Sequence, residues 1–393
     1  MVLVIDTFKL VKGAGKSIGI YNLTKSLVSY LGAENVRRGM PHKIVVLGNP
    51  KNQKDMERDG TEFVIVPGNP LDRKTFVIWE LFRVSKYARR YHADRILFPR
   101  GYRPLVYRGK DTIIVHDLIP FWYNENCPGY LGRVENAYIM NRLKASIRHA
   151  DRVITISDYS RQEIDKLVPG SYGKVKEIYN GLNDIEPWDP GVPVGSAEGD
   201  AKGNPETSAP VAKEDYIVAV TTKMPHKNAK GIAAAYERYC SVCKERKAEP
   251  LPLRIIGIPQ IDAFIRDGVI SNENARRVTC FSYIEKYSDM CRMIAKARMF
   301  LFLSLAEGFG FPPLEAMQMG TPVVSSDRTA LREVVADAGL LVDPDKPQEV
   351  AEALLRLQGD QALCADLIAK GYRNIRRFSW KTRTQEYWDE LFQ

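Results

Sequence analysis

Short apolar runs alternate with amphipathic stretches along the first half of the chain. Runs of strand length lie at residues 2–5, 43–47, 62–66, 95–98, 112–115 and 152–156. Helical patterns separate several of them, notably at residues 75–91 and 131–149. This alternation predicts an α/β fold with a parallel sheet covered by helices on both faces. Ligands of such sheets bind outside the carboxyl ends of the strands.

The pattern is interrupted once and then resumes. Residues 187–213 are rich in Pro, Gly, Ser and Ala and have no apolar period, so we interpret them as a flexible linker, weakly ordered near 195–208. Strands are expected again at 215–220, 253–256, 299–303 and 340–342, and helices at 348–357 and from 361 onward. A chain of 393 residues is too long for one ordinary core. The sequence therefore predicts two domains, residues 1–186 and 214–374.

The most informative stretch covers residues 299–327 and predicts strand, glycine loop, short helix and strand. Pro312 and Pro313 suit a first helical turn, and Gly320 suits a helix end. Free N–H groups at a helix start, next to glycines, suit a phosphate. Glu307 and Glu315 flank the loop, and a carboxylate can accept bonds from two vicinal hydroxyls. The stretch predicts a sugar-nucleotide pocket; the alternative is a surface loop whose Glu315 merely favours the helix dipole.

This run closely resembles the donor-binding signature of the retaining glycosyltransferases of family 4. The resemblance implies a GT-B fold, in which two Rossmann-like domains face each other across a cleft, with a C-terminal helix of about residues 375–393 crossing back. It also implies transfer from a nucleoside-diphosphate sugar without a metal or other cofactor, Glu307 holding sugar hydroxyls and Glu315 the ribose. The donor-binding residues implied in this run are Glu307, Gly308, Phe309, Gly310, Phe311, Leu314 and Glu315.

Further donor residues follow from the same resemblance. Lys227, in Pro-His-Lys-Asn, matches the lysine that neutralises the donor diphosphate. The family commonly has Gly-Arg where this chain has Thr221-Thr222. Either Thr222 or Lys223 then takes the arginine's place. The alternative for Lys223 is a solvated lysine of the loop. Tyr283 and Ile284 match the segment that reads the base. The Pro-His-Lys-Asn form is similar to bacterial mannosyl- and rhamnosyltransferases, which makes mannose and a GDP-sugar the first choices.

The first domain supplies the remaining candidates. His116 and Asp117 follow the 112–115 strand, and the resemblance directs His116 toward the donor sugar, although a lone histidine is often structural. Asp117 either orients His116 or caps the loop. Gly19 matches the first loop of the family, where it allows close approach of donor phosphates and acceptor. The family's basic residue is replaced by Ile20, which puts a contact there in doubt. The catalytic candidates are thus His116, Lys227 and Glu307, and the acceptor-side candidates are Gly19, His116 and Asp117.

Two local motifs carry less weight. Residues 13–17 read Gly-Ala-Gly-Lys-Ser, but a nucleotide-binding P-loop needs a glycine at the position of Leu10, so we interpret them as a glycine turn at Gly15 that opens a helix. Ser160 and Glu163, after the 152–156 strand, fit an N-cap and its capping box.

Composition excludes several classes of protein. No apolar run reaches the roughly 18 residues of a membrane-spanning helix. The start lacks a signal-peptide pattern, so a cytoplasmic location is expected. Cys240 and Cys243 form one Cys-x-x-Cys pair, but the second pair that a zinc site would need is not present in the sequence. The six cysteines are therefore expected to be buried or half-buried free thiols. Neither an Asp-x-Asp after a strand nor a His/Cys cluster is present, so no metal is expected.

The net charge of +9 is concentrated in one window. Residues 73–110 contain eleven Lys or Arg residues against two carboxylates, and the rest of the chain is neutral. Such a patch indicates an anionic partner. Aromatic and basic residues on or beside the predicted helix are Phe76, Trp79, Phe82, Arg83, Lys86, Arg90 and Arg95. They predict peripheral contact with anionic membrane at the inner face of the cell membrane; the alternative is a helix packed on the sheet with a solvated basic face. Nucleic acid is not expected, because no recognition motif is present.

The function predicted is a retaining glycosyltransferase that moves a sugar, mannose first, to a glycan or lipid-linked glycan in cell-surface polysaccharide synthesis. Two alternatives stay open. One is a GT-B epimerase or hydrolase of sugar nucleotides, and the other is a degenerate transferase that acts as a non-catalytic partner subunit.

Overall fold

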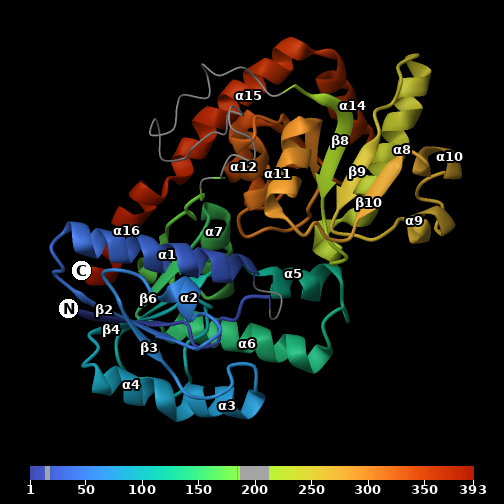
Figure 1. Ribbon diagram of the computed structural model, residues 1–393. Helices are drawn as coiled ribbons and strands as arrows, with labels where there is room; N and C mark the ends of the chain where they lie inside the picture. The colour runs from blue at the N-terminus through green and yellow to red at the C-terminus, as the bar shows by residue number, and fades with distance from the viewer. Residues whose placement is uncertain (14–17, 184, 186–211) are drawn as a thin grey trace. The chain divides into compact units, whose positions relative to one another are not determined.

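The computed structural model describes residues 1–13, 18–183, 185 and 212–393. They form two compact units, each built on a parallel sheet with helices around it (Figure 1). Unit 1 comprises Met1–Gly181 and Trp380–Gln393, and unit 2 comprises Leu182–Ser379. The predicted turn at Gly15 and nearly all of the predicted 187–213 linker, including its 195–208 part, lie outside the described residues.

Unit 1 contains a seven-stranded parallel sheet with the order β3-β2-β1-β4-β5-β6-β7. The strands are β1 (Val2–Asp6), β2 (Lys43–Gly48), β3 (Glu62–Ile65), β4 (Arg95–Phe98), β5 (Asp111–Val115), β6 (Arg152–Thr155) and β7 (Val175–Glu177). The six apolar runs predicted in this half of the chain are all confirmed as strands, and β7 is additional. Every residue of β4 and β5 is buried, as expected for central strands covered on both faces.

The helices of unit 1 include the C-terminal segment of the chain. They are α1 (Ile18–Arg37), α2 (Gln53–Met56), α3 (Arg73–Ile78), α4 (Val84–Arg90), α5 (Ile119–Asn126), α6 (Arg133–His149), α7 (Asp158–Leu167) and α16 (Trp380–Phe392), with a π-helical turn at Trp79–Arg83. Helix α16 packs against α1, and the Trp380 indole stacks on Tyr30 with ring centroids 5.1 Å apart. A Cβ at Gly181 would lie 2.1 Å from that indole, so the small residue permits the packing.

The start of α7 corrects one prediction. The N-cap is Ser157, not Ser160: the Ser157 Oγ accepts a hydrogen bond from the Ser160 N–H at 3.2 Å. Ser157 has the extended backbone of an N-cap, whereas Ser160 already lies inside the helix. The Ser160 prediction is wrong because two serines three positions apart both fit a capping pattern, and only the end of β6 distinguishes them.

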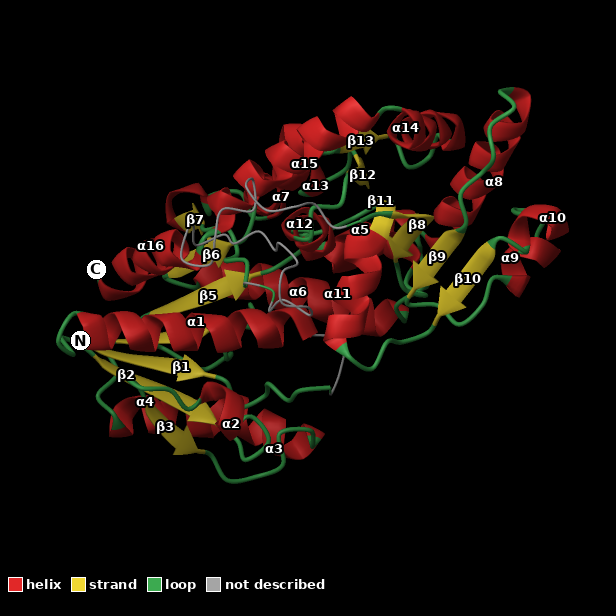
Figure 2. Ribbon diagram, turned by 45° about the horizontal axis from the view of Figure 1, so that its top comes forward, coloured by secondary structure: helices red, strands yellow, loops and turns green. Residues whose placement is uncertain are grey.

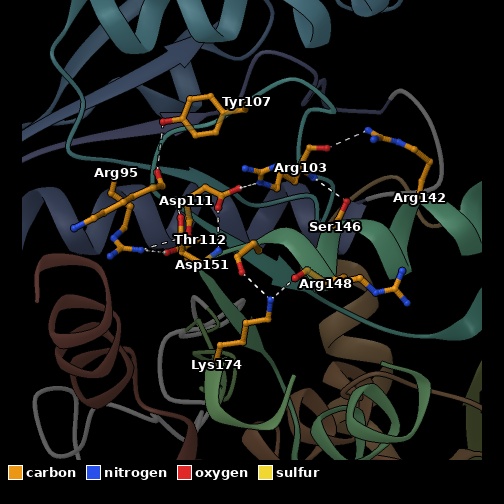
Figure 3. Close-up of polar contacts among 12 residues, drawn as sticks. Arg95, Arg103, Tyr107, Asp111, Thr112, Arg142, Ser146, Arg148, Asp151 and Lys174 are labelled. Atoms are coloured by element: carbon orange, nitrogen blue, oxygen red, sulfur yellow. Dashed lines mark hydrogen bonds and ion pairs between the residues drawn. The ribbon is translucent and has the colours of Figure 1, made fainter. Parts of the chain in front are cut away.

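A buried ion cluster lies where β5 of unit 1 begins (Figure 3). The Arg103 Nε donates to Oδ2 of Asp111 at 2.6 Å, and the Asp111 side chain is fully buried. The backbone N–H of Asp151 donates to the other Asp111 oxygen at 3.1 Å. Burial raises the pKa of Asp111 to about 6. Arg95 is 5% exposed and donates to Oγ1 of Thr112, so its predicted place on a basic surface is wrong.

Unit 2 contains a six-stranded parallel sheet with the order β10-β9-β8-β11-β12-β13 (strands in yellow in Figure 2). The strands are β8 (Glu214–Val220), β9 (Leu253–Ile256), β10 (Val278–Phe281), β11 (Ala297–Phe302), β12 (Val323–Ser326) and β13 (Leu340–Val342). The helices are α8 (Ala229–Glu245), α9 (Asp262–Arg266), α10 (Asn272–Ala275), α11 (Tyr287–Lys296), α12 (Phe311–Gln318), α13 (Leu331–Val335), α14 (Pro347–Gly359) and α15 (Gln361–Ile375). Helices α8 and α14 pack together, and Cys240 and Cys243 of α8 are buried free thiols, as predicted.

Candidate active site

The strand order of unit 2 places a topological switch between β8 and β11. The chain continues from β8 toward β9 on one side and from β11 toward β12 on the other. The loops that follow these two strands therefore diverge, and open α/β sheets bind ligands at this position. Lys227 lies in the loop after β8, and Glu307 lies in the loop after β11.

Lys227 and Glu307 form an ion pair although 80 positions separate them. The Lys227 Nζ donates to Oε1 of Glu307 at 2.5 Å, and the side chains are 22% and 10% exposed. The backbone N–H of Glu307 donates to Oγ1 of Thr329 at 3.0 Å. The pair fixes one carboxylate oxygen, and the other can accept a bond from a ligand hydroxyl. The structure thus brings two of the three predicted catalytic residues together at the switch.

The loop between β8 and α8 is held by hydrogen bonds on both sides of Lys227. Within the loop, Oγ1 of Thr221 donates to the Lys227 carbonyl at 2.8 Å. Asn228 adopts a left-handed conformation, caps α8 by accepting from the Gly231 N–H at 3.0 Å, and donates from Nδ2 to the Leu303 carbonyl at 3.0 Å. These bonds tie the loop to the end of β11 and so fix the position of Lys227.

A pocket of about 550 Å³ lies beside the same loop in unit 2. Its lining includes Thr222 and the basic residues Lys223, Lys230 and Arg266, and none of its described lining residues is a carboxylate. Within the described part of the chain, none of these three basic residues forms an ion pair. The larger apolar lining residues are Met224, Pro225, Ile258, Pro259 and Phe264. Positive charge beside an apolar wall suits an anion with an apolar portion.

The predicted Thr222 and Lys223 thus share one pocket, but Lys227 and Glu307 are not among its described lining residues. Gly257 follows β9 with φ +109° and directly precedes the lining residue Ile258. A Cβ at this position would lie 1.8 Å from the Thr221 carbonyl oxygen. Only glycine allows the two loops to approach so closely.

The start of α12 matches its prediction closely. Pro312 and Pro313 occupy the first turn, and Gly310 precedes the helix with φ +120°. The side chains of Phe309 and Leu314 are buried, and Phe309 packs edge-on against Phe378 at 5.3 Å. The predicted donor contacts of Phe309 and Leu314 are therefore limited to their backbone groups. Gly308 and Phe311 border the same turn.

Glu315 lies in the second turn of α12 and is half-buried. The Tyr287 hydroxyl, at the start of α11, donates to Oε1 of Glu315 at 3.3 Å. Burial raises the pKa of Glu315. Tyr283 and Ile284 lie between β10 and α11, and the Tyr283 side chain is 77% exposed.

In unit 1, His116 follows β5 and is held by the loop after β4. Its Nε2 lies 2.6 Å from the Pro99 carbonyl oxygen. A carbonyl only accepts, so Nε2 carries the proton and Nδ1 of the neutral ring is an acceptor. Burial lowers the pKa of His116 to about 4, so the ring is neutral near pH 7.

The other two acceptor-side candidates, Asp117 and Gly19, differ in setting. Oδ1 of Asp117 accepts from the Ile119 N–H at 3.1 Å, which favours the capping alternative over orientation of His116. Gly19 lies in the first turn of α1, and a Cβ there would meet no atom within 4 Å.

Sequence reasoning missed a group at the corresponding switch of unit 1, between β1 and β4. A small pocket there is lined by Asp6, Lys9, Glu80, Arg100 and other residues. The Trp79 Nε1 donates to Oδ2 of Asp6 at 3.0 Å, and burial raises the pKa of Asp6 to about 6. Trp79 is 1% exposed, so its predicted place on an aromatic and basic surface is wrong. Asp6 could have been identified from the sequence, because it is a carboxylate directly after the first apolar run.

His226 and Tyr287 were also missed. His226 is buried beside Lys227, and burial lowers its pKa to about 4, so it adds no positive charge to the loop near pH 7. Nothing in the sequence pattern distinguishes either residue. Among the described residues, no group of three or more His, Cys, Asp or Glu side chains is arranged to hold a metal ion.

Comparisons with known proteins agree with this architecture. A family model described as Glycosyltransferase Family 4 matches residues 25–185, and one described as Glycosyl transferases group 1 matches residues 215–360. O-antigen chain mannosyltransferase B of Escherichia coli is 28% identical over 315 residues, which cover 75% of this chain and 77% of that protein.

Solved structures extend the similarity to the whole chain. Sucrose-phosphate synthase from Thermosynechococcus elongatus superimposes with a TM-score of 0.69 at 18% identity, over 100% of this chain and 99% of that one. Anabaena HepE in complex with UDP-glucose gives 0.63 at 18% identity, again over 100% and 99%. The GT-B fold predicted from the sequence is confirmed by these neighbours and by the two parallel-sheet units. The chain therefore belongs to glycosyltransferase family 4 and is a glycosyltransferase with the GT-B fold.

Proposed function

We propose that this glycosyltransferase moves a hexose, mannose in the first place, from a nucleoside-diphosphate sugar to a glycan or lipid-linked glycan, with retention of configuration. The product would be part of a cell-surface polysaccharide. The observation that carries the proposal is the Lys227–Glu307 pair at the switch between β8 and β11. The similarity to an O-antigen chain mannosyltransferase supports the sugar and the pathway, and a neighbour in complex with UDP-glucose supports the donor class.

The charges of the site suit departure of a nucleoside diphosphate. In the proposed reaction, Lys227 and the backbone amides of the 308–311 loop stabilise the negative charge that grows on the leaving group. Lys223 and Thr222 add to this from the neighbouring pocket. These groups take the place of a metal ion in the proposal, which assigns no resident cofactor. GDP is the first choice of nucleotide.

Carboxylates and a neutral imidazole would hold the sugars. Glu307 accepts hydroxyl bonds from the transferred sugar, and Glu315 accepts them from the ribose. His116 is neutral near pH 7, so it can accept a hydroxyl bond through Nδ1 but holds no spare proton to donate. Gly19 and Asp117 complete the acceptor side of the proposal.

A nucleotide-sugar panel tests the assignment. Melting temperature and nucleotide release are measured with GDP-, UDP-, dTDP- and ADP-mannose or -glucose. A ligand at 100 times its Kd stabilises a folded protein by about 2.7 kcal/mol. One donor class should raise the melting temperature, and release should need a glycan acceptor. Release without acceptor would instead indicate a hydrolase, conversion of the donor into an epimeric sugar nucleotide would indicate an epimerase, and no response to any donor would indicate a non-catalytic subunit.

The variant Glu307→Gln keeps the shape of the side chain and removes its charge. Transfer should fall by about 10²-fold or more, as for other groups that hold charge in a transition state. Circular dichroism checks that the variant is folded. Activity near that of the unchanged protein would remove Glu307 from the site and with it the central assignment.

We also propose peripheral contact with an anionic membrane through the α3–α4 segment. Phe82 is 67% exposed, Val77 and Ile78 are exposed, and Lys86 and Arg90 are exposed beside them. Trp79 and Arg95 are buried and take no part, and the Phe76 side chain lies outside the described ones. No helix in the described residues is long and apolar enough to cross a bilayer.

Vesicle sedimentation tests this contact. Binding should require anionic lipid and should fall in Phe82→Ser/Arg90→Gln, whereas Val36→Ser, at an exposed position of α1, should bind normally. Equal binding to purely zwitterionic vesicles would refute the electrostatic part of the proposal.

A further inference from the structure

The carboxylate of Glu315 is held on one side only. Within the described part of the chain, the bond from the Tyr287 hydroxyl at 3.3 Å is the single hydrogen bond to this carboxylate. A carboxylate has about four acceptor positions, so most of this capacity is free. Glu315 is half-buried, and burial raises its pKa, so its ionised form is less favourable there than in a free glutamate. The setting favours a ligand that brings its own hydroxyl donors.

Tyr287 is placed to control the orientation of this carboxylate. It begins α11, and its side chain is 52% exposed while its hydroxyl is turned to Glu315. Cys291, one turn further along α11, is a buried thiol whose pKa is raised to about 12, so it stays neutral and does not repel the carboxylate. Burial and the neighbouring Glu315 also raise the pKa of Tyr287, so the phenol keeps its proton and acts as the donor.

We propose that Tyr287 is a positioning residue for recognition of the ribose: it fixes Oε1 of Glu315 and thereby leaves Oε2 to accept from the vicinal 2′- and 3′-hydroxyls of the donor nucleotide. Without the phenol, the carboxylate can rotate about its terminal torsion, which is broad in a free glutamate. Tyr287 is 52% exposed, so in this proposal a ribose held by Glu315 can lie beside its ring. The proposal rests on the assignment of unit 2 as the donor-binding unit.

The test compares nucleotides with and without the diol. Calorimetric titration with GDP, UDP, dTDP and ADP identifies the nucleotide that binds, and its 2′,3′-dideoxy form measures the contribution of the hydroxyls. Loss of one hydrogen bond to a charged group corresponds to about a tenfold loss of affinity. In Tyr287→Phe, affinity for the ribonucleotide should therefore fall about tenfold, and affinity for the dideoxy form should not change.

A double variant shows whether Tyr287 acts through Glu315. Glu315→Ala should abolish discrimination between the two nucleotides, and Tyr287→Phe should then have no further effect in Tyr287→Phe/Glu315→Ala. The matched control is Tyr172→Phe, because Tyr172 is a 75%-exposed tyrosine of unit 1. It should bind both nucleotides normally.

The outcomes separate the two proposals. If the unchanged protein binds none of GDP, UDP, dTDP and ADP, the donor assignment fails. If it binds and discriminates but Tyr287→Phe discriminates equally well, the role of Tyr287 is refuted. Equal loss of affinity for both forms in Tyr287→Phe would also refute it, because a merely structural residue would affect both nucleotides alike.

Discussion

Replacement of Gly257 by alanine should damage unit 2 far more than its single methyl group suggests. Gly257 has φ +109°, and its added Cβ would lie 1.8 Å from the carbonyl oxygen and 2.9 Å from the carbonyl carbon of Thr221. Both are backbone atoms, so no side-chain rotation relieves the overlap. Backbone strain of this kind costs about 1–3 kcal/mol.

The overlap can be relieved only if the ends of β8 and β9 separate. That movement breaks the hydrogen bond from the Thr221 N–H to the Ile256 carbonyl, 2.9 Å, and endangers the bond from the Gly257 N–H to the Phe281 carbonyl, 2.7 Å. A buried group left without its partner costs about 1–3 kcal/mol. Together with the strain, we expect Gly257→Ala to lower the free energy of unfolding of unit 2 by about 3 kcal/mol or more.

Urea denaturation measures the total effect, and hydrogen exchange at the ends of β8 and β9 locates it. Gly268→Ala is the matched control for backbone strain alone, since φ is +68° and no atom lies within 4 Å of its Cβ. Gly359→Ala, with an ordinary φ and open space, controls for the methyl group and should be neutral or slightly stabilising. If Gly257→Ala costs no more than Gly268→Ala, the close approach of the two loops is not as described.

Three further predictions concern ionisable groups. Lys227→Gln should lower affinity for a nucleoside diphosphate about tenfold and leave affinity for the nucleoside unchanged. Titration calorimetry measures both affinities, and an equal loss for both ligands would contradict a phosphate contact. The pKa of His116 is about 4 in the folded protein and about 6.5 in an unfolded chain. The stabilising contribution of neutral His116 is therefore complete above about pH 6.5 and is lost as pH falls toward 4. The free energy of unfolding should decline with falling pH in this interval, and His116→Gln should reduce the slope of that decline by up to about 1.4 kcal/mol per pH unit. An unchanged slope in urea denaturation would refute this. Arg103→Gln should leave the buried Asp111 without its ion-pair partner and destabilise unit 1 by about 3 kcal/mol at pH 7.5. The loss should be smaller at pH 5, below the folded pKa of Asp111 of about 6, and an equal loss at both pH values would contradict the ion pair.

The sequence by itself determined most of the strands, whereas β7 was found only in the structure. Central strands of parallel sheets are buried on both faces, so they are read as continuous apolar runs, and β4 and β5 illustrate this. The start of α12 was predictable because proline and glycine act through their own backbone restrictions, which need no distant partner. Glu307 and Glu315 could be identified as candidates for the same reason: their spacing around that turn is local.

Tertiary structure alone decided which of these groups meet. The order of the strands brings Lys227 to Glu307 across 80 positions and Tyr287 to Glu315 across 28. Neither contact can be predicted from the sequence around these residues. It also decided burial: Trp79 and Arg95 belong to a window that is aromatic and basic throughout, yet both are buried. The physical reason is that residue type and spacing govern the conformation of the nearby backbone, whereas burial, pairing and pKa depend on what the rest of the chain places around each side chain.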